Sequence, residues 1–195
     1  MVSGSAADEP SASRRSLLVS LGAGAAGVLR LAGCGSSAPR RSASPQVNWP
    51  VGTADEADLL NALLGNEYFA IAAYTAATPL LTGAASRVAR QFLGQEVLHA
   101  DRLIHLIQKA GGAPQRAQAS YDLGQPGSAG QLMTLLLAAE HRQIRAYVQA
   151  VPQLTSAQLR STVASILATQ ARHAALWRLQ LGQRPAPTAL VTGDE

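Results

Sequence analysis

The chain contains only one cysteine, Cys34, among its 195 residues, so no intramolecular disulfide can stabilise it. Aromatic residues make up 4% of the sequence, and beyond residue 41 the arginines are scattered rather than clustered. Both features argue against a nucleic-acid-binding domain, although the formal net charge is +4. The sequence also lacks a glycine-rich phosphate loop and a nucleophile elbow, so two common types of enzyme site have no signal here.

No stretch alternates between apolar and polar residues as a half-buried strand would. From Thr53 onward the apolar residues instead recur at helical spacing. Capping boxes at 53–56 and 155–158 indicate helix starts, while Pro79, Gly111 and Pro152 indicate helix ends. We therefore predict an all-α domain with four helices, which run over about 53–78, 82–111, 128–151 and 155–182.

Residues 1–33 have the features of an export signal rather than of a folded segment. Ser13-Arg14-Arg15-Ser16-Leu17-Leu18 matches the twin-arginine pattern, and a short, glycine-containing apolar stretch follows it. The segment ends in Leu31-Ala32-Gly33-Cys34, which resembles a bacterial lipobox. We expect lipidation of Cys34, with the mature protein anchored at the outer face of the cytoplasmic membrane, in the cell envelope. Residues 34–52, rich in Ser, Pro, Ala and Gly, are predicted to be a flexible tether.

The predicted helical region contains an internal repeat of a helix pair. An offset of 73 residues maps Glu67 onto Glu140 and also aligns neighbouring Leu, Ile, Tyr and Pro residues. An offset of 74 maps Glu96 onto Gln170 and His99 onto His173. Helical periodicity alone would align leucines, but it would not be expected to align the Glu, Tyr, Pro and His residues as well.

The lengths of the connections predict the topology. The first and second helices are joined by a short link, as are the third and fourth, so each pair forms an antiparallel hairpin. Residues 112–127 form a connection long enough to run the length of a bundle. The predicted fold is an antiparallel four-helix bundle over residues 53–182, with one long crossover between the second and third helices, and an irregular tail over 183–195.

Polar residues interrupt the apolar stripe of each predicted helix near its middle. Glu96 and His99 are three residues apart, so they lie on one helical face among residues that should form the core. Buried carboxylates repel one another unless they are protonated or bridged by cations. The candidate metal ligands from all four helices are Glu67, Glu96, His99, Glu140, Gln170 and His173.

This pattern resembles the ferritin-like superfamily, in which the first and third helices each give a Glu and the second and fourth each give Glu-x-x-His. The more specific resemblance is to exported bacterial ferritin-like domain proteins. The resemblance covers about residues 53–182 and implies that the six candidate residues surround two iron or manganese ions. It also implies chemistry on oxygen, peroxide or ferrous iron, so that an enzyme of this kind would be a di-metal oxidoreductase.

The chain departs from the family pattern at Gln170, where a carboxylate is expected. An amide oxygen brings no charge and is a weaker ligand, so weaker binding, a single ion or a preference for zinc are alternative outcomes. A second interpretation is a decayed site without metal, in which the same side chains form a hydrogen-bonded polar core. The protein would then be a non-catalytic scaffold or binding lipoprotein of the cell envelope, with an envelope protein or a second copy as its partner.

Overall fold

The computed structural model describes residues 54–195. Within this range the structure contains α-helices and short 3-10 helices but no strand, which confirms the all-α prediction. The elements are α1 (Ala54–Ala77), η1 (Thr78–Leu80), α2 (Gly83–Lys109), α3 (Ala129–Ala150), η2 (Val151–Gln153) and α4 (Ala157–Gln180). The predicted export signal, the lipobox with Cys34 and the tether lie outside the described residues.

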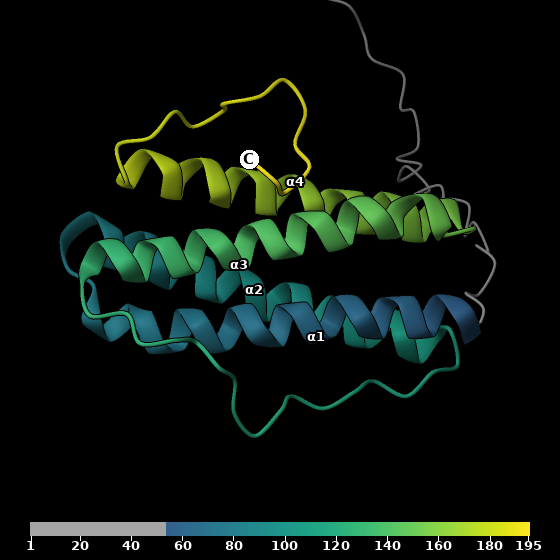
Figure 1. Ribbon diagram of the computed structural model, residues 1–195. Helices are drawn as coiled ribbons and strands as arrows, with labels where there is room; N and C mark the ends of the chain where they lie inside the picture. The colour runs from purple at the N-terminus through teal and green to yellow at the C-terminus, as the bar shows by residue number, and fades with distance from the viewer. Residues whose placement is uncertain (1–53) are drawn as a thin grey trace, which may run out of the picture. The chain divides into compact units, whose positions relative to one another are not determined.

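Helices α1 and α2 form one antiparallel hairpin, and α3 and α4 form the other (Figure 1). The crossover runs back along α1, to which it is held by Asn61, whose Nδ2 donates to Ala113 O at 3.0 Å. Helix α1 packs against both α2 and α3, and α3 packs against α4, whereas α2 and α4 pack against each other only sparsely. The predicted bundle with one long crossover is therefore observed. No helix among the described residues is long and apolar enough to cross a membrane.

The helix ends follow local signals, with small differences from the predicted limits. Pro79 lies in η1, so α1 ends at Ala77 and a single 3-10 turn follows. Helix α2 ends at Lys109, and Gly111 then adopts a positive φ of 79°, a left-handed conformation that favours glycine. Ser128 is the N-cap of α3, and its side chain accepts a hydrogen bond from Gln131 N.

The capping box predicted at the start of α4 is wrong by one residue. Ser156, not Thr155, is the N-cap, and its side chain accepts from Leu159 N. Thr155 N donates instead to Glu56 Oε1 in the first turn of α1, at 2.7 Å, and Ser156 N donates to the same oxygen at 3.3 Å. A carboxylate from α1 therefore satisfies backbone donors at the start of α4, which local sequence patterns do not reveal.

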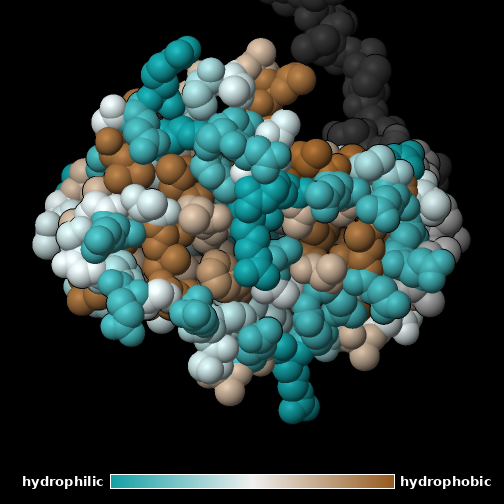
Figure 2. Space-filling model, viewed as in Figure 1, coloured by the Kyte–Doolittle hydropathy of each residue, from teal (hydrophilic) through white to brown (hydrophobic). Residues whose placement is uncertain are grey.

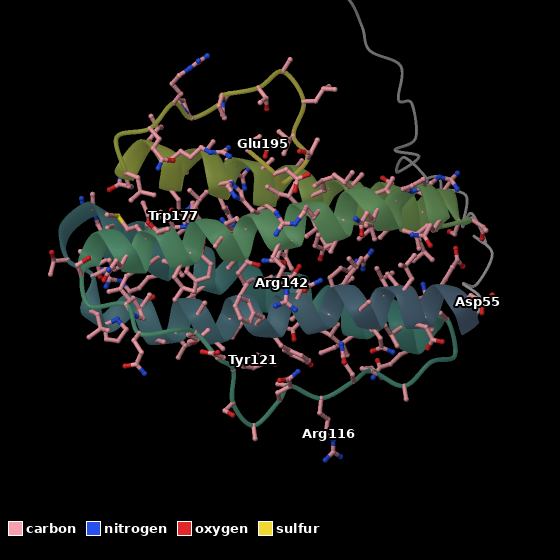
Figure 3. The ribbon with its side chains drawn as sticks, viewed as in Figure 1. Asp55, Arg116, Tyr121, Arg142, Trp177 and Glu195 are labelled. Atoms are coloured by element: carbon pink, nitrogen blue, oxygen red, sulfur yellow. The ribbon has the colours of Figure 1, made fainter. Side chains whose placement is uncertain are left out.

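The apolar core consists of two clusters. The first lies toward the end where α1 begins and α2 ends, and includes Leu60 and Leu103. The second lies toward the opposite end and includes Tyr74, Phe92 and Trp177. Figure 3 shows Trp177 between α4 and the helices beneath it. The polar residues singled out above occupy mid-helix positions between these apolar segments.

The tail after α4 has no helix or strand and folds back over the α3–α4 hairpin (Figure 1). Arg178, a buried residue of α4, donates to Glu195 O at 2.9 Å. Arg145 of α3 lies 3.4 Å from Asp194 Oδ1. On the face shown in Figure 2, hydrophilic and hydrophobic residues are interspersed, so the apolar residues there form no single large patch.

Candidate metal centre

The structure brings all six predicted residues together in the centre of the bundle. They come from all four helices: Glu67 from α1, Glu96 and His99 from α2, Glu140 from α3, and Gln170 and His173 from α4. All except His99 are fully buried, and the side chain of His99 is 14% exposed. The interior therefore contains three carboxyl groups, which is costly unless each has a compensating partner.

One group of potential ligands consists of Glu67, Glu96 and His99, whose candidate ligand atoms lie within 4.8 Å of one another. His99 Nδ1 lies 3.9 Å from Glu67 Oε2 and 3.7 Å from Glu96 Oε2. We refer to the space between these three side chains as position 1. Two carboxylates and an imidazole are a ligand set suited to iron, manganese or zinc.

A second group consists of Glu96, Glu140 and His173 and defines position 2. His173 Nδ1 lies 3.0 Å from Glu96 Oε1 and 3.4 Å from Glu140 Oε1. Glu96 belongs to both groups and directs a different carboxylate oxygen toward each. Its position is therefore the one expected of a ligand shared by two neighbouring metal positions.

Several buried polar atoms at this site have no hydrogen-bond partner within the described chain. They are Glu67 Oε2, Glu140 Oε2 and Gln170 Oε1. Each belongs to a residue predicted as a ligand, and buried polar atoms are rarely left unpaired. The donor set thus fits a bound cation, because an ion between these atoms would satisfy several of them at once.

Gln170 forms hydrogen bonds within the site. Its Nε2 donates to Glu96 Oε2 at 3.0 Å and lies 3.3 Å from His99 Nδ1. It also donates to Gln143 Oε1 at 3.0 Å, and Gln143 Nε2 in turn donates to Glu96 Oε2 at 2.8 Å. The two amides thus fill part of the space that a second bridging carboxylate would occupy.

Gln143 was not predicted from the sequence. It lies three residues after Glu140 on the same helical face, a spacing that could have indicated it. The internal repeat gave no such signal, because the offset of 73 maps Gln143 onto Ala70.

Two tyrosines connect the hairpins across the site. Tyr74 of α1 donates to Glu140 of α3, and Tyr147 of α3 donates to Glu67 of α1. Trp177 Nε1 donates to the Tyr74 hydroxyl at 2.6 Å. All three aromatic residues are buried. The hydrogen bonds orient the two carboxylates, as groups outside the immediate ligand set commonly do in metal sites.

Burial and mutual repulsion raise the pKa of two of the carboxyl groups. Burial raises the pKa of Glu67 well above its ordinary value, and the neighbouring Glu96 carboxylate raises it further. Burial and the same neighbour raise the pKa of Glu140 to about 7. In the metal-free protein these groups therefore favour their protonated forms at mildly acidic pH.

Glu96 and His173 favour their charged forms instead. Burial by itself would raise the pKa of Glu96, but the adjacent His173 and His99 rings hold it below its ordinary value. For His173 burial acts in the opposite direction and would lower the pKa, but the carboxylates of Glu140 and Glu96 raise it to about 9. A carboxylate–imidazolium pair thus occupies position 2 when no metal is bound.

The other histidines lie away from these two groups. His105 is exposed. His141 is half-buried, and its Nε2 lies 2.9 Å from Arg178 Nη2 beneath the tail. A residue that the sequence did not single out, Gln95, contacts the site directly, because its Oε1 lies 2.6 Å from His173 Nε2.

Comparison with known proteins supports the observed fold. No curated protein matches the chain. A solved structure of a conserved hypothetical protein, rv2844, from Mycobacterium tuberculosis is 22% identical, with a TM-score of 0.63, covering 66% of this chain and 98% of that one. A second solved structure, of ferritin-like, diiron-carboxylate proteins from Bacillus anthracis str. Ames, is 21% identical, with a TM-score of 0.58. The match covers 65% of this chain and 95% of that one.

At these identities the structural matches establish the fold alone. The sequence itself also matches the family model described as ferritin-like domain, over residues 55–183. That range includes all four helices of the bundle except the first residue of α1, and every residue of the candidate metal centre. The chain is a member of the ferritin-like domain family.

Proposed function

We propose that this protein binds two transition-metal ions in the centre of the bundle and is a metal-dependent oxidoreductase. The observation that carries the proposal is the pair of three-residue ligand groups that share Glu96. The structural neighbour from Bacillus anthracis is described as a diiron-carboxylate protein, which supports iron as one candidate metal. Manganese is the other, since both ions accept mixed carboxylate and imidazole ligands.

In this proposal Glu67 and His99 would hold an ion at position 1, Glu140 and His173 would hold one at position 2, and Glu96 would contribute to both. A bound iron or manganese pair would supply one-electron redox chemistry toward oxygen, peroxide or ferrous iron. Tyr74 and Tyr147 would fix the orientation of the two terminal carboxylates. The apolar clusters on both sides would limit entry of bulk water.

Gln170 makes this site less negative than one with four carboxylates. Two divalent ions bring four positive charges, and three ionised carboxylates supply three negative ones. One positive charge is left in a buried environment, where it is costly unless an anion accompanies the metal. We therefore expect the two ions to bind with unequal affinity.

A non-catalytic scaffold with a metal-free polar core is the second candidate function. The hydrogen bonds of Gln170 to Glu96 and Gln143 favour it, because they satisfy part of the site without a metal. The unpaired oxygens of Glu67 and Glu140 argue for metal instead. The first proposal is preferred because a metal satisfies more of the buried atoms.

The experiment that separates these functions is a metal titration of the purified chain after chelator treatment. Iron, manganese and zinc are added in turn, and bound metal is measured by isothermal titration calorimetry and elemental analysis. Stoichiometric binding that raises the melting temperature supports the metal-dependent function. Absence of binding by all three ions supports the scaffold.

We further propose that the protein is exported and anchored in the cell envelope through a lipid on Cys34. The twin-arginine pattern and the Leu-Ala-Gly-Cys motif support this location. Twin-arginine export usually carries folded cargo, which suits a protein that acquires its metal before export. If the scaffold candidate holds, an envelope protein or a second copy of the chain is the expected partner.

A further inference from the structure

The two histidines of the site differ in their access to solvent. His173 is fully buried, with the ring of Phe92 stacked on it at a centroid distance of 3.7 Å and Gln95 against its Nε2. His99 is 14% exposed and lines a groove of about 370 Å³ between α2 and α4. Position 1 therefore lies beside an opening, whereas position 2 is covered.

The internal repeat identifies the residues that cause this difference. The offset of 74 places Ile166 at the position equivalent to Phe92, and Thr169 at the position equivalent to Gln95. Both Ile166 and Thr169 line the groove. Because each is smaller than its counterpart, neither covers His99 in the way that Phe92 and Gln95 cover His173.

The chemistry of the groove favours an anion. Its lining residues include Arg102 and His99 from α2, together with four hydroxyl-bearing residues of α4, which are Ser161, Thr162, Ser165 and Thr169. None of the lining residues, all within the described chain, is acidic. Arginine and hydroxyl groups donate hydrogen bonds to carboxylate and phosphate oxygens, whereas a free metal cation would be repelled by Arg102.

We propose that the α2–α4 groove is a binding site for a small carboxylate or phosphate anion, and that it gives this anion access to position 1 only. The part of this inference that brings the anion to a metal ion rests on the proposed function, in which position 1 holds a metal. An anion there would also supply the negative charge that Gln170 does not. Substrates that are anions would thus be preferred over ferrous iron.

Access through the groove is tested on the metal-free chain with diethyl pyrocarbonate, and modification of each histidine is followed by mass spectrometry. In the unchanged protein His99 should react and His173 should not, while exposed His105 provides the internal reference. Thr169→Gln introduces on α4, beside His99, the same side chain with which Gln95 of α2 covers His173. It should slow modification of His99 by about tenfold relative to His105, since reaction then requires local opening.

Thr169→Ser, which keeps a small side chain, is the matched control and should leave the reaction of His99 unchanged. Ser165→Phe blocks the groove at an exposed position and should also slow the reaction if Thr169→Gln fails to fold. The reciprocal variant Gln95→Thr should make His173 reactive. Unaltered modification of His99 in a folded Thr169→Gln or Ser165→Phe protein would overturn the groove as the route of access.

Anion binding is tested on the same metal-free chain by NMR of the histidine imidazoles during separate titrations with acetate and inorganic phosphate. The His99 signals should shift in a saturable way with at least one anion, and the better ligand identifies a carboxylate or phosphate preference. Arg102→Gln should weaken binding by about fivefold, the size expected for one solvent-exposed charge contact.

Arg116→Gln is the control for Arg102→Gln, because Arg116 points away from the bundle on the crossover (Figure 3). Absence of a saturable shift with both anions, or equal affinities in the Arg102→Gln and unchanged proteins, would overturn the anion assignment. Neither experiment uses a metal, so the results of both would stand even if the protein bound no metal. A failure of the proposed metal binding would be seen in the metal titration instead.

Discussion

The Tyr147 hydroxyl on α3 donates a hydrogen bond to Glu67 on α1, and its repeat counterpart Tyr74 donates to Glu140 in the opposite direction. Each hairpin thus orients the carboxylate of the other. Spacing along one helix puts each tyrosine two turns from the glutamate of its own helix, so the crossed pairing is a product of the assembled bundle. It links the folding of the two hairpins to the geometry of the metal centre.

Replacing Tyr147 by Phe should weaken metal binding by about 10- to 100-fold while the fold is retained. The hydroxyl lowers the pKa of Glu67, opposing the effect of burial, so its loss favours the protonated acid that cannot bind metal. Competition with a fluorescent chelator measures the affinity. Tyr121→Phe, on the crossover, is the control, and equal affinities in the two variants would contradict this role of Tyr147.

Replacing Gln170 by Glu should raise the metal content toward two ions per chain. The variant restores the fourth carboxylate of the family pattern, which balances two divalent ions. It should also destabilise the metal-free protein, because a further buried carboxyl is left without a cation. Elemental analysis and thermal unfolding with and without metal measure both effects. Gln149→Glu, at an exposed position on α3, is the control and should change neither the metal content nor the stability. If Gln170→Glu binds no more metal than this control, the site is closed to a second ion.

The metal-free protein should lose stability as the pH rises from about 5 to about 9. The folded pKa of Glu140 is raised to about 7, so the stability that its protonated form contributes is lost as the pH rises from the ordinary value toward 7. The pKa of His173 is raised to about 9, which adds a second contribution to stability. This contribution is complete below the ordinary pKa of histidine and is lost as the pH rises through 9.

Metal should reverse this dependence, because ligands must be deprotonated to bind. Urea unfolding with chelator and with metal, at several pH values across that range, measures both slopes. Glu140→Gln should flatten the part of the metal-free slope between pH 4.5 and about 7. A metal-free stability that rises throughout the range would contradict the assigned protonation states.

Removal of the Glu56 side chain should destabilise the bundle without removing its metal. Glu56 Oε1 accepts hydrogen bonds from Thr155 N and Ser156 N at the start of α4. Glu56→Ala leaves these donors without this carboxylate, and we expect a loss of about 1–3 kcal/mol in the free energy of unfolding. Asp58→Ala, an exposed acidic residue nearby on α1, is the control. Equal stability of the two variants would contradict the role of Glu56.

Replacing Cys34 by Ala should release the exported protein from the membrane into the soluble envelope fraction. The thiol of Cys34 is the group to which the proposed lipid is attached. Fractionation of cells followed by immunoblotting measures the distribution. Cys34 lies outside the described residues, so this prediction depends on the sequence alone. Continued attachment of the variant to the membrane would contradict the lipid anchor.

Much of the site could be predicted because its residues repeat at fixed offsets on amphipathic helices. Glu67 with Glu140, and His99 with His173, were found in this way. Gln143 was missed because its repeat counterpart is Ala70. Contacts between helices, such as those from Tyr147 to Glu67 and from Thr155 to Glu56, depend on how the helices pack, which helical periodicity does not specify.

The most direct test of the account is elemental analysis of the chain, purified without a metal-affinity tag and incubated with iron, manganese and zinc, beside the Glu96→Ala/His99→Ala variant. We predict near-stoichiometric iron or manganese in the unchanged protein, and loss of both the metal and its effect on the melting temperature in the double variant. Metal at background level in the unchanged protein, or equal metal in both proteins, would contradict the centre at Glu96.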